Sequence, residues 1–314
     1  MEKLSTQLRK HFILMFLLLS VVMLFVTTTT DDAFATESGG NAYPLGAEDF
    51  MSGAVPPPGV YFINYFLYYA ADEFNDDHGD SLVPDFDLEA AVNTFRFIYV
   101  TKHKIFGGNW GMHLFVPVWN LELTHPPLGG SQARAGAGDL IVDPLILSWH
   151  SKNWHFATGV DVYIPTGRHD DHDFANISRN YFTFEPIFAF TYMSDSGYEV
   201  SSKFMYDFNT ENKDSISGGQ YLSGQEFHFD YTLGKKFGPL SVGVGGYYYK
   251  QITDDELNGE KVEPDGFKGQ AIAVGPQIKY DWRNISLILK YLTEFEVENR
   301  PEGNDLWFKF VYAF

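Results

Sequence analysis

Many stretches of the chain alternate large apolar and polar side chains, and this alternation limits the fold more than any other feature. In the segment 226–233, four apolar residues alternate with four polar ones, namely Phe227, Phe229, Tyr231 and Leu233 with Glu226, His228, Asp230 and Thr232. Successive side chains of a β-strand point to opposite faces, so this pattern predicts a strand with one apolar face. The last residues repeat it, with apolar side chains at Leu306, Phe308, Phe310, Tyr312 and Phe314.

Segments of this kind recur along the chain and are separated by turn residues. We predict about twelve strands, an even number that is typical of single-chain bacterial barrels. They are 60–70, 88–102, 110–122, 139–150, 154–165, 180–193, 198–209, 224–235, 240–252, 267–282, 284–296 and 305–314.

The charged residues of these strands indicate which face lies inside. A Lys or Arg on the lipid face at mid-bilayer costs about 2–4 kcal/mol, so the charged faces should line the lumen. The lumen candidates are Arg96, Asp161, Glu185, Lys203, Asp207, Glu226, His228, Asp230, Lys290 and Lys309. A soluble barrel or sandwich would instead place its apolar face inside. The extent of the aromatic face and the C-terminal Phe314 favour the membrane barrel.

The predicted connections alternate between long and short. The long ones are 72–85, 123–138, 166–179, 210–223, 253–266 and 297–304, and several are strongly acidic. Long outer loops and short periplasmic turns are typical of outer-membrane proteins. The predicted fold is therefore all-β, a single antiparallel up-and-down transmembrane β-barrel of about twelve strands with long acidic outer loops and short periplasmic turns.

The N-terminus has the composition of a secretory signal peptide. Basic residues precede an apolar run at 12–26, and Ala33-Phe34-Ala35 is a cleavage site of the small-x-small type. A membrane anchor needs ~20 apolar residues, more than this run provides. We therefore predict a cleaved signal peptide at 1–35.

Two further parts of the mature chain follow from this boundary. Residues 36–58 form an N-terminal extension that is either periplasmic or inserted in the lumen, and residues 59–314 form the outer-membrane barrel. The extension contains four large apolar side chains that could plug a small barrel, namely Tyr43, Leu45, Phe50 and Met51.

Candidate chemistry is sparse. The five residues 169–173 (His-Asp-Asp-His-Asp) resemble a metal site, but no ligand spacing on a rigid element supports one, so a solvated acidic loop is the expectation. The acidic loops could also bind Ca²⁺ weakly, without an EF-hand pattern. Glu226, His228 and Asp230 share one strand face and could form a hydrolytic group, yet no G-x-S-x-G motif accompanies them. We predict no catalytic residues, no metal site and no cofactor.

Charge and location restrict the partners. The formal net charge is −19, which makes nucleic acid a poor partner. The expected location is the outer membrane of a Gram-negative-type bacterium. The expected partners are outer-membrane lipid and lipopolysaccharide, a small hydrophobic permeant, and the barrel-assembly machinery, which would read Phe314. We expect a monomer.

Several runs resemble one known family, the phenol meta-pathway-degradation-like (SphA-type) outer-membrane proteins. These runs are PPPGVYFINYFLYY (56–69), GAGDLIVDPLILSWH (136–150), GVDVYIPTG (159–167), NYFTFEPIFAFTY (180–192) and LSGQEFHFDYTLGKKF (222–237). The resemblance implies a transmembrane barrel related to transport, with hydrophobic compounds such as aromatics or lipid-like molecules as the associated substrates. It implies no catalytic residues.

Three functions remain open from the sequence. The first is a passive, non-enzymatic channel or transporter for small hydrophobic or aromatic compounds, with the lumen residues setting selectivity. The second is a structural or surface-binding barrel with an occluded lumen. The third is an outer-membrane enzyme built around Glu226 and His228, for which no complete motif exists.

Overall fold

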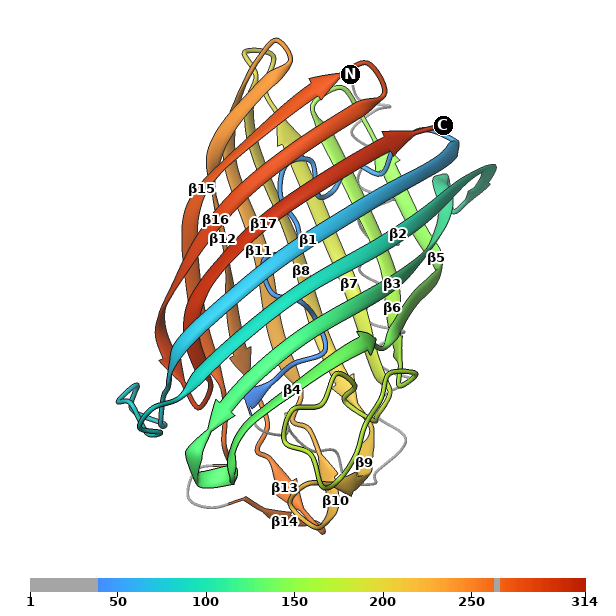
Figure 1. Cartoon of the computed structure of the whole chain (residues 1–314). Helices are drawn as coiled ribbons and strands as arrows, with labels where there is room; N and C mark the ends of the chain where they lie inside the picture. Colours follow the sequence, from blue (N-terminus) through green and yellow to red (C-terminus); the bar gives the residue numbers. More distant parts are fainter. Residues whose placement is uncertain (1–38, 263–265) are drawn as a thin grey trace. The chain divides into compact units, whose positions relative to one another are not determined.

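The computed structural model describes residues 39–262 and 266–314, which form one closed antiparallel β-barrel (Figure 1). Twelve strand positions make up the wall. The strands are β1 Gly59–Phe74, β2 Asp87–Ile105, β3 Gly108–His125, β5 Leu140–His150, β6 Trp154–Ile164, β7 Thr183–Met193, β8 Tyr198–Asn209, β11 Glu226–Phe237, β12 Leu240–Gln251, β15 Gln270–Trp282, β16 Ile285–Glu298 and β17 Pro301–Ala313. Each pairs with its neighbour in sequence, and β1 pairs with β17 to close the wall.

One wall segment was missed by the sequence analysis. The expected connection 123–138 is wrong, because β4 (Gly130–Ala137) lies within it and pairs with residues 118–125 of β3. β5 pairs with residues 109–115 of the same strand, so β4 and β5 follow each other in one strand position of the wall. β4 consists mainly of Gly, Ala, Ser and Gln, and without large apolar side chains it shows no alternation in the sequence.

Two other connections also differ from expectation. The connection 297–304 is a two-residue turn at Asn299 and Arg300, because residues from Pro301 onward pair with the end of β1. Asn299 has a φ of 54°, a left-handed conformation that Asn tolerates in tight turns. The connections around 210–223 and 253–266 carry a small four-stranded sheet of β9 Glu211–Ser215, β10 Gly219–Leu222, β13 Glu256–Leu257 and β14 Glu260–Lys261.

Residues 39–262 and 266–314 contain little helix. One turn of 3₁₀ helix, η2 (Pro126–Leu128), follows β3. Within residues 39–262 and 266–314, no helix is long and apolar enough to cross a membrane.

The two ends of the barrel differ. Short turns such as 106–107, 151–153 and 283–284 gather at one end, where the chain also ends, since Phe314 N donates to Val60 O. The small sheet and most of the long connections gather at the other end (Figure 1). We refer to these as the short-turn end and the loop end.

The outer surface of the barrel is apolar. Leu289 on β16 is 47% exposed, and its cross-strand partners Ile278 and Phe308 are 42% and 40% exposed. Aromatic rings also contact one another along the outside from β6 to β12, for example Phe188 with Phe204 and Phe204 with Phe229. Continuous apolar surface of this kind indicates a lipid-facing belt, since a soluble barrel would carry polar residues there.

The belt predicts a depth-dependent penalty for charge. Leu289→Lys should lower the free energy of unfolding by about 2–4 kcal/mol, because it places an ammonium group among apolar neighbours inside the bilayer. Phe237→Lys, at the short-turn end of β11 and equally outward-facing, should cost only about 0–1 kcal/mol. Denaturant titration of the folded protein in lipid vesicles measures both. Equal costs for the two variants would contradict the assignment of the belt.

Candidate functional site

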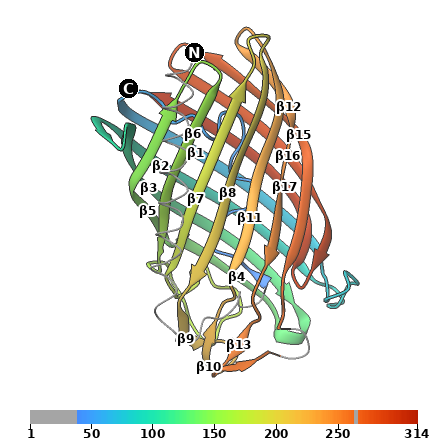
Figure 2. The ribbon, with the colours of Figure 1, turned by 180° about the vertical axis from the view of Figure 1, so that it is seen from behind.

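The lumen contains the N-terminal extension. Residues 39–58, here called the lumen segment, run inside the wall from the loop end to the start of β1 (Figure 2). Near its beginning, Arg300 Nη2 donates to Asn41 Oδ1 at 2.9 Å, and near its end Gly53 N donates to Thr191 Oγ1 at 3.0 Å. Of the predicted plug side chains, Tyr43, Leu45 and Phe50 are buried and Met51 is half-buried. The predicted signal peptide 1–35 lies outside the described residues.

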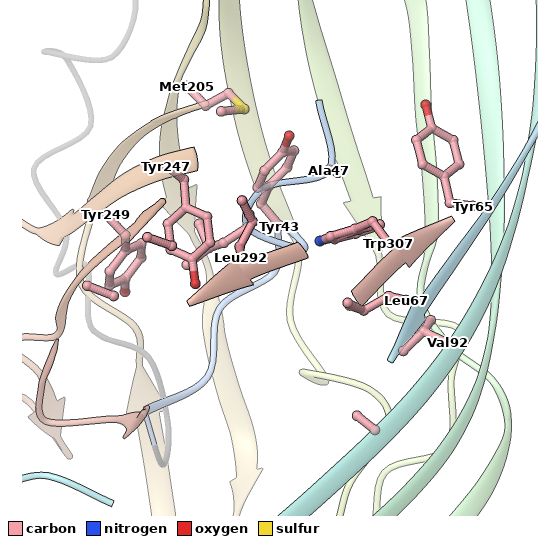
Figure 3. Close-up of a cluster of buried hydrophobic side chains, with 14 of the residues drawn as sticks. Tyr43, Ala47, Tyr65, Leu67, Val92, Met205, Tyr247, Tyr249, Leu292 and Trp307 are labelled. Carbon is pink, nitrogen blue, oxygen red and sulfur yellow. The ribbon is translucent and has the colours of Figure 1, made fainter. Parts of the chain in front are cut away.

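The lumen segment packs against inward-facing side chains of the wall. Tyr43, Leu45 and Ala47 belong to one buried cluster with residues of β1, β12, β16 and β17 (Figure 3). Gly46 adopts a φ of +76°, and a Cβ there would lie 2.8 Å from Leu292 Cδ1. On the wall, a Cβ at Gly234 would lie 2.6 Å from the Phe50 ring. The segment and the wall therefore fit each other closely at two glycines.

Asp230 on β11 is the main anchor of the lumen segment. Its carboxylate accepts hydrogen bonds from Tyr43 Oη at 2.6 Å, Gly46 N at 3.1 Å and Glu48 N at 2.8 Å. The Asp230 side chain is buried. Hydrogen bonds to a charged group contribute about 1.5–3 kcal/mol each, so this carboxylate holds the bend of the segment firmly.

Three lumen cations also hold the segment. Lys290 donates to the carbonyl oxygens of Gly46 and Glu48, the second at 2.8 Å. Lys309 Nζ lies 2.7 Å from Asp49 Oδ2. Arg96 Nη1 lies 3.6 Å from Glu48 Oε1. Four of the ten predicted lumen residues (these three and Asp230) thus bind the chain's own N-terminal segment.

The other six candidates lie together on β6, β7, β8 and β11. They are Asp161, Glu185, Lys203, Asp207, Glu226 and His228, all buried. Lys203 Nζ lies 3.3 Å from Asp161 Oδ2 and 3.6 Å from Glu185 Oε1. All ten candidates are inside the wall, buried or half-buried, whereas their part in selectivity stays a prediction.

His113 on β3 joins this network and was not singled out from the sequence. Its Nδ1 lies 2.9 Å from Arg96 Nη2, and its Nε2 lies 2.7 Å from Asp161 Oδ1. A guanidinium only donates, so Nδ1 accepts and Nε2 carries the proton toward Asp161. The signal available in the sequence was parity, because His113 alternates with the apolar residues on either side of it.

A cavity of about 290 Å³ lies between the lumen segment and the wall on the side of β1 to β3. Its apolar lining includes Leu67, Ala90, Val92, Phe115, Trp119, Leu121 and Ile141. This lining was not predicted from the sequence, because these strands carry large apolar residues on both faces and so do not alternate clearly. On β2, for example, Phe97 is exposed and Val92 is buried. The lumen is therefore apolar on one side and charged on the other.

The acidic loop cluster 169–173 is not assembled into one site. His169 Nε2 lies 2.6 Å from Asp214 O, and Asp173 pairs with Arg134. Asp170, Asp171 and His172 lie close together, but the His172 side chain is 87% exposed. A hydrogen bond to Asp171 raises the pKa of His172, so protons compete with a metal ion there.

The three side chains considered as a hydrolytic group, Glu226, His228 and Asp230, have different partners. Asn209 Nδ2 donates to Glu226 Oε1 at 3.2 Å, and His228 Nε2 lies 3.2 Å from Asp207 Oδ2. Asp230 is occupied by the lumen segment. The three side chains share a face of β11 but not a common reaction centre.

Residues 71–310 match the sequence profile of the family described as "Putative MetA-pathway of phenol degradation". The chain belongs to this family. The family resemblance noted from the sequence is therefore confirmed. A search of curated protein sequences finds no match to this family member.

Several solved structures of outer-membrane proteins are similar to this chain. An outer-membrane channel from Pseudomonas putida F1 matches with 15% identity and a TM-score of 0.75, over 84% of this chain and 98% of that chain. The β-domain of the Bordetella autotransporter BrkA has 9% identity and a TM-score of 0.49, over 82% of this chain and 100% of that chain. A mutant of the TodX monoaromatic hydrocarbon channel has 10% identity and a TM-score of 0.44, over 90% of this chain and 97% of that chain. The first likeness supports the predicted fold class of an all-β outer-membrane barrel.

The anchor role of Asp230 predicts local loosening in Asp230→Asn. The variant loses the charge that three donors share, so amide hydrogen exchange in residues 42–50 should accelerate at least tenfold. Hydrogen-exchange mass spectrometry of the folded protein measures this. Asp305→Asn, a buried lumen carboxylate on β17, is the matched control and should leave these amides unchanged. Equal exchange in Asp230→Asn and the unmodified chain would contradict the anchor role.

Proposed function

We propose that this family member is a passive, non-enzymatic channel of the Gram-negative outer membrane for small hydrophobic or aromatic compounds. The observation that carries the proposal is the cavity of about 290 Å³ inside the lumen, whose lining on β1 to β3 is apolar. Channels for ions or sugars have polar lumens on all sides, whereas this one has an aliphatic and aromatic wall from β1 to β3.

The size of the cavity supports this substrate class. An apolar protein cavity of about 150 Å³ holds benzene, so the space beside the lumen segment is sufficient for a substituted aromatic ring. Polar groups such as Arg179 and Arg300 lie on the lining toward the loop end. They would orient a polar substituent while the ring contacts residues such as Leu121 and Val92.

A hollow on the outer surface supports a route between lumen and lipid. It has a volume of about 340 Å³ and is lined by apolar residues of β2, β3 and β5, with His113 and Asp143 also in its lining. The register of β3 with β5 shifts between Gly111 and His113, and the pairing of β5 with β6 is interrupted between Val142 and Leu147. The strand pairing of the wall is therefore irregular where the hollow meets the lumen network.

The proposal includes partners that follow from the surface. The apolar belt would contact outer-membrane lipid and lipopolysaccharide, and the exposed Phe314 would be read by the barrel-assembly machinery. We propose a monomeric channel, because the closed wall leaves no strand edge in the belt for pairing with another copy.

Uptake should depend on the apolar wall. Leu121→Asn places an amide in the cavity lining and should reduce uptake of a monocyclic aromatic into proteoliposomes about tenfold, since the amide must lose water to accommodate the ring. Leu121→Met keeps the volume and polarity and is the matched control. An unmodified protein that folds but transports no aromatic compound would overturn the proposal, as would equal uptake by the two variants.

A second candidate function is a structural or surface-binding barrel with an occluded lumen. The contacts of the lumen segment with Asp230, Lys290 and Lys309 favour it, because they hold the segment inside the lumen. The acidic loop end would then supply the binding surface.

Removal of the lumen segment separates these functions. Deletion of residues 40–52 should raise single-channel conductance several-fold in planar bilayers, because it vacates the lumen while the wall stays closed. In a transport channel, the unmodified protein already passes aromatic compounds and the deletion lowers its selectivity. In an occluded structural barrel, the unmodified protein passes none, and only the deletion variant becomes permeable.

A further inference from the structure

Five carboxylates form a row across adjacent strands of the wall. Asp161 and Glu185 are cross-strand partners, as are Asp207 and Glu226. Phe184 pairs with Phe208, which places Glu185 beside Asp207, and the pairing of Val142 with Val162 places Asp143 beside Asp161. Like charges directly opposite each other on neighbouring strands are destabilising, and either protons or nearby positive charge relieve this repulsion.

Positive charge is supplied to only one end of the row. Asp161 has Lys203 at 3.3 Å and the N–H of His113 at 2.7 Å. Glu185 has Lys203 Nζ at 3.6 Å. Among the described residues, no Lys or Arg nitrogen lies within 4 Å of the carboxylate of Asp207 or Glu226.

Three carboxylate oxygens of the row, on β7, β8 and β11, accept no hydrogen bond from the described residues. Glu185 Oε1, Asp207 Oδ1 and Glu226 Oε2 have no hydrogen-bond partner within the described part of the chain, and all three side chains are 0% exposed. Buried carboxylate oxygens are normally paired or bound to metal. These atoms are therefore available as ligands for a cation.

We propose that Glu185, Asp207 and His228 bind a divalent metal ion inside the wall. Their ligand atoms all lie within 4.8 Å of one another. His228 Nε2 lies 3.2 Å from Asp207 Oδ2 and 3.8 Å from Glu185 Oε2. Metal bonds of about 2.0–2.2 Å to nitrogen and oxygen put neighbouring ligands about 3–4 Å apart, so a cation fits between these atoms.

The ligand set selects the class of metal. One imidazole with two carboxylates suits Zn²⁺ or Mn²⁺ better than Ca²⁺, which prefers oxygen ligands alone. Tyr163 Oη donates to Glu185 Oε2 at 2.9 Å and would orient that ligand. Glu226, the cross-strand partner of Asp207, lies next to this ligand set. The Tyr43 ring lies 4.9 Å from the His228 ring, so the lumen segment covers the site.

The neighbouring group of His113, Asp143 and Asp161 is less suited to bind a metal ion. Its ligand atoms are equally close, but both nitrogens of His113 are engaged by Arg96 and Asp161. Lys203 lies within 4 Å of a carboxylate in both groups, but Arg96 Nη2 lies 2.9 Å from His113 alone and adds a second positive charge there, which repels a metal ion. His113 is therefore a matched control for His228. The proposal concerns the wall alone and does not rest on the transport function.

Metal content of the refolded protein tests the proposal. Untagged chain is stripped with chelator while unfolded, refolded in detergent with Zn²⁺, Mn²⁺ or Co²⁺ because the site is fully buried, and freed of unbound ion. Mass spectrometry should find one equivalent of retained metal, and Co²⁺ should give visible absorption. Asp207→Asn and His228→Gln should retain less than a tenth of this amount. His113→Gln, and His172→Ala in the exposed loop, should retain it in full.

A stability readout keeps the variants interpretable. Each is checked for folding by its heat-dependent mobility in gels, and its thermal unfolding is recorded with and without metal. Metal should raise the melting temperature of the unmodified chain but not of Asp207→Asn, which should be at least as stable as the metal-free parent because it removes one repelling charge. Glu294→Gln replaces His113→Gln if the latter does not fold. No retained metal in the parent, or equal retention in Asp207→Asn, would overturn the proposal.

Discussion

Closure of the strand ladder between β1 and β17 is the constraint on which the rest of the structure depends. In lipid, each backbone N–H and C=O must find a partner within the protein, and only a closed wall achieves this with strands. Closure fixes the parity of every strand, so the residues on one face meet lipid and those on the other meet the lumen. Lys309 and Phe308 on β17 are a direct example, the first buried and the second 40% exposed.

The narrow lumen that results is crowded with charge, and the chain resolves this largely with its own N-terminus. The lumen segment brings backbone donors to Asp230 and backbone acceptors to Lys290, and Asp49 pairs with Lys309. These contacts compensate charges on three strands of the wall, β11, β16 and β17. The row from Glu185 to Glu226 lies outside their reach, and this is where the metal ion is proposed.

The lumen has two chemical characters because the wall does. The strands β6 to β11 carry ionisable residues inward, while β1 to β3 carry Leu67, Val92 and Leu121 inward. The cavity beside the apolar half provides space for a hydrophobic compound, and the charged half fixes the lumen segment that bounds this space. Transport and occlusion therefore depend on the same contacts, differing only in whether the space beside the segment is continuous.

The sequence by itself determined the strand positions and the orientation of most charged residues, because alternation is a local property that each strand carries. The segment 198–209 coincides with β8, and Asp161, Glu185 and Lys203 follow from parity alone. Only the tertiary structure decided the place of β4, the apolar lining of the lumen and the grouping of Glu185, Asp207 and His228. β4 and the apolar lining could not be predicted because their strands alternate weakly. The grouping of the three side chains depends on the register between neighbouring strands, which is set by pairing in the closed wall.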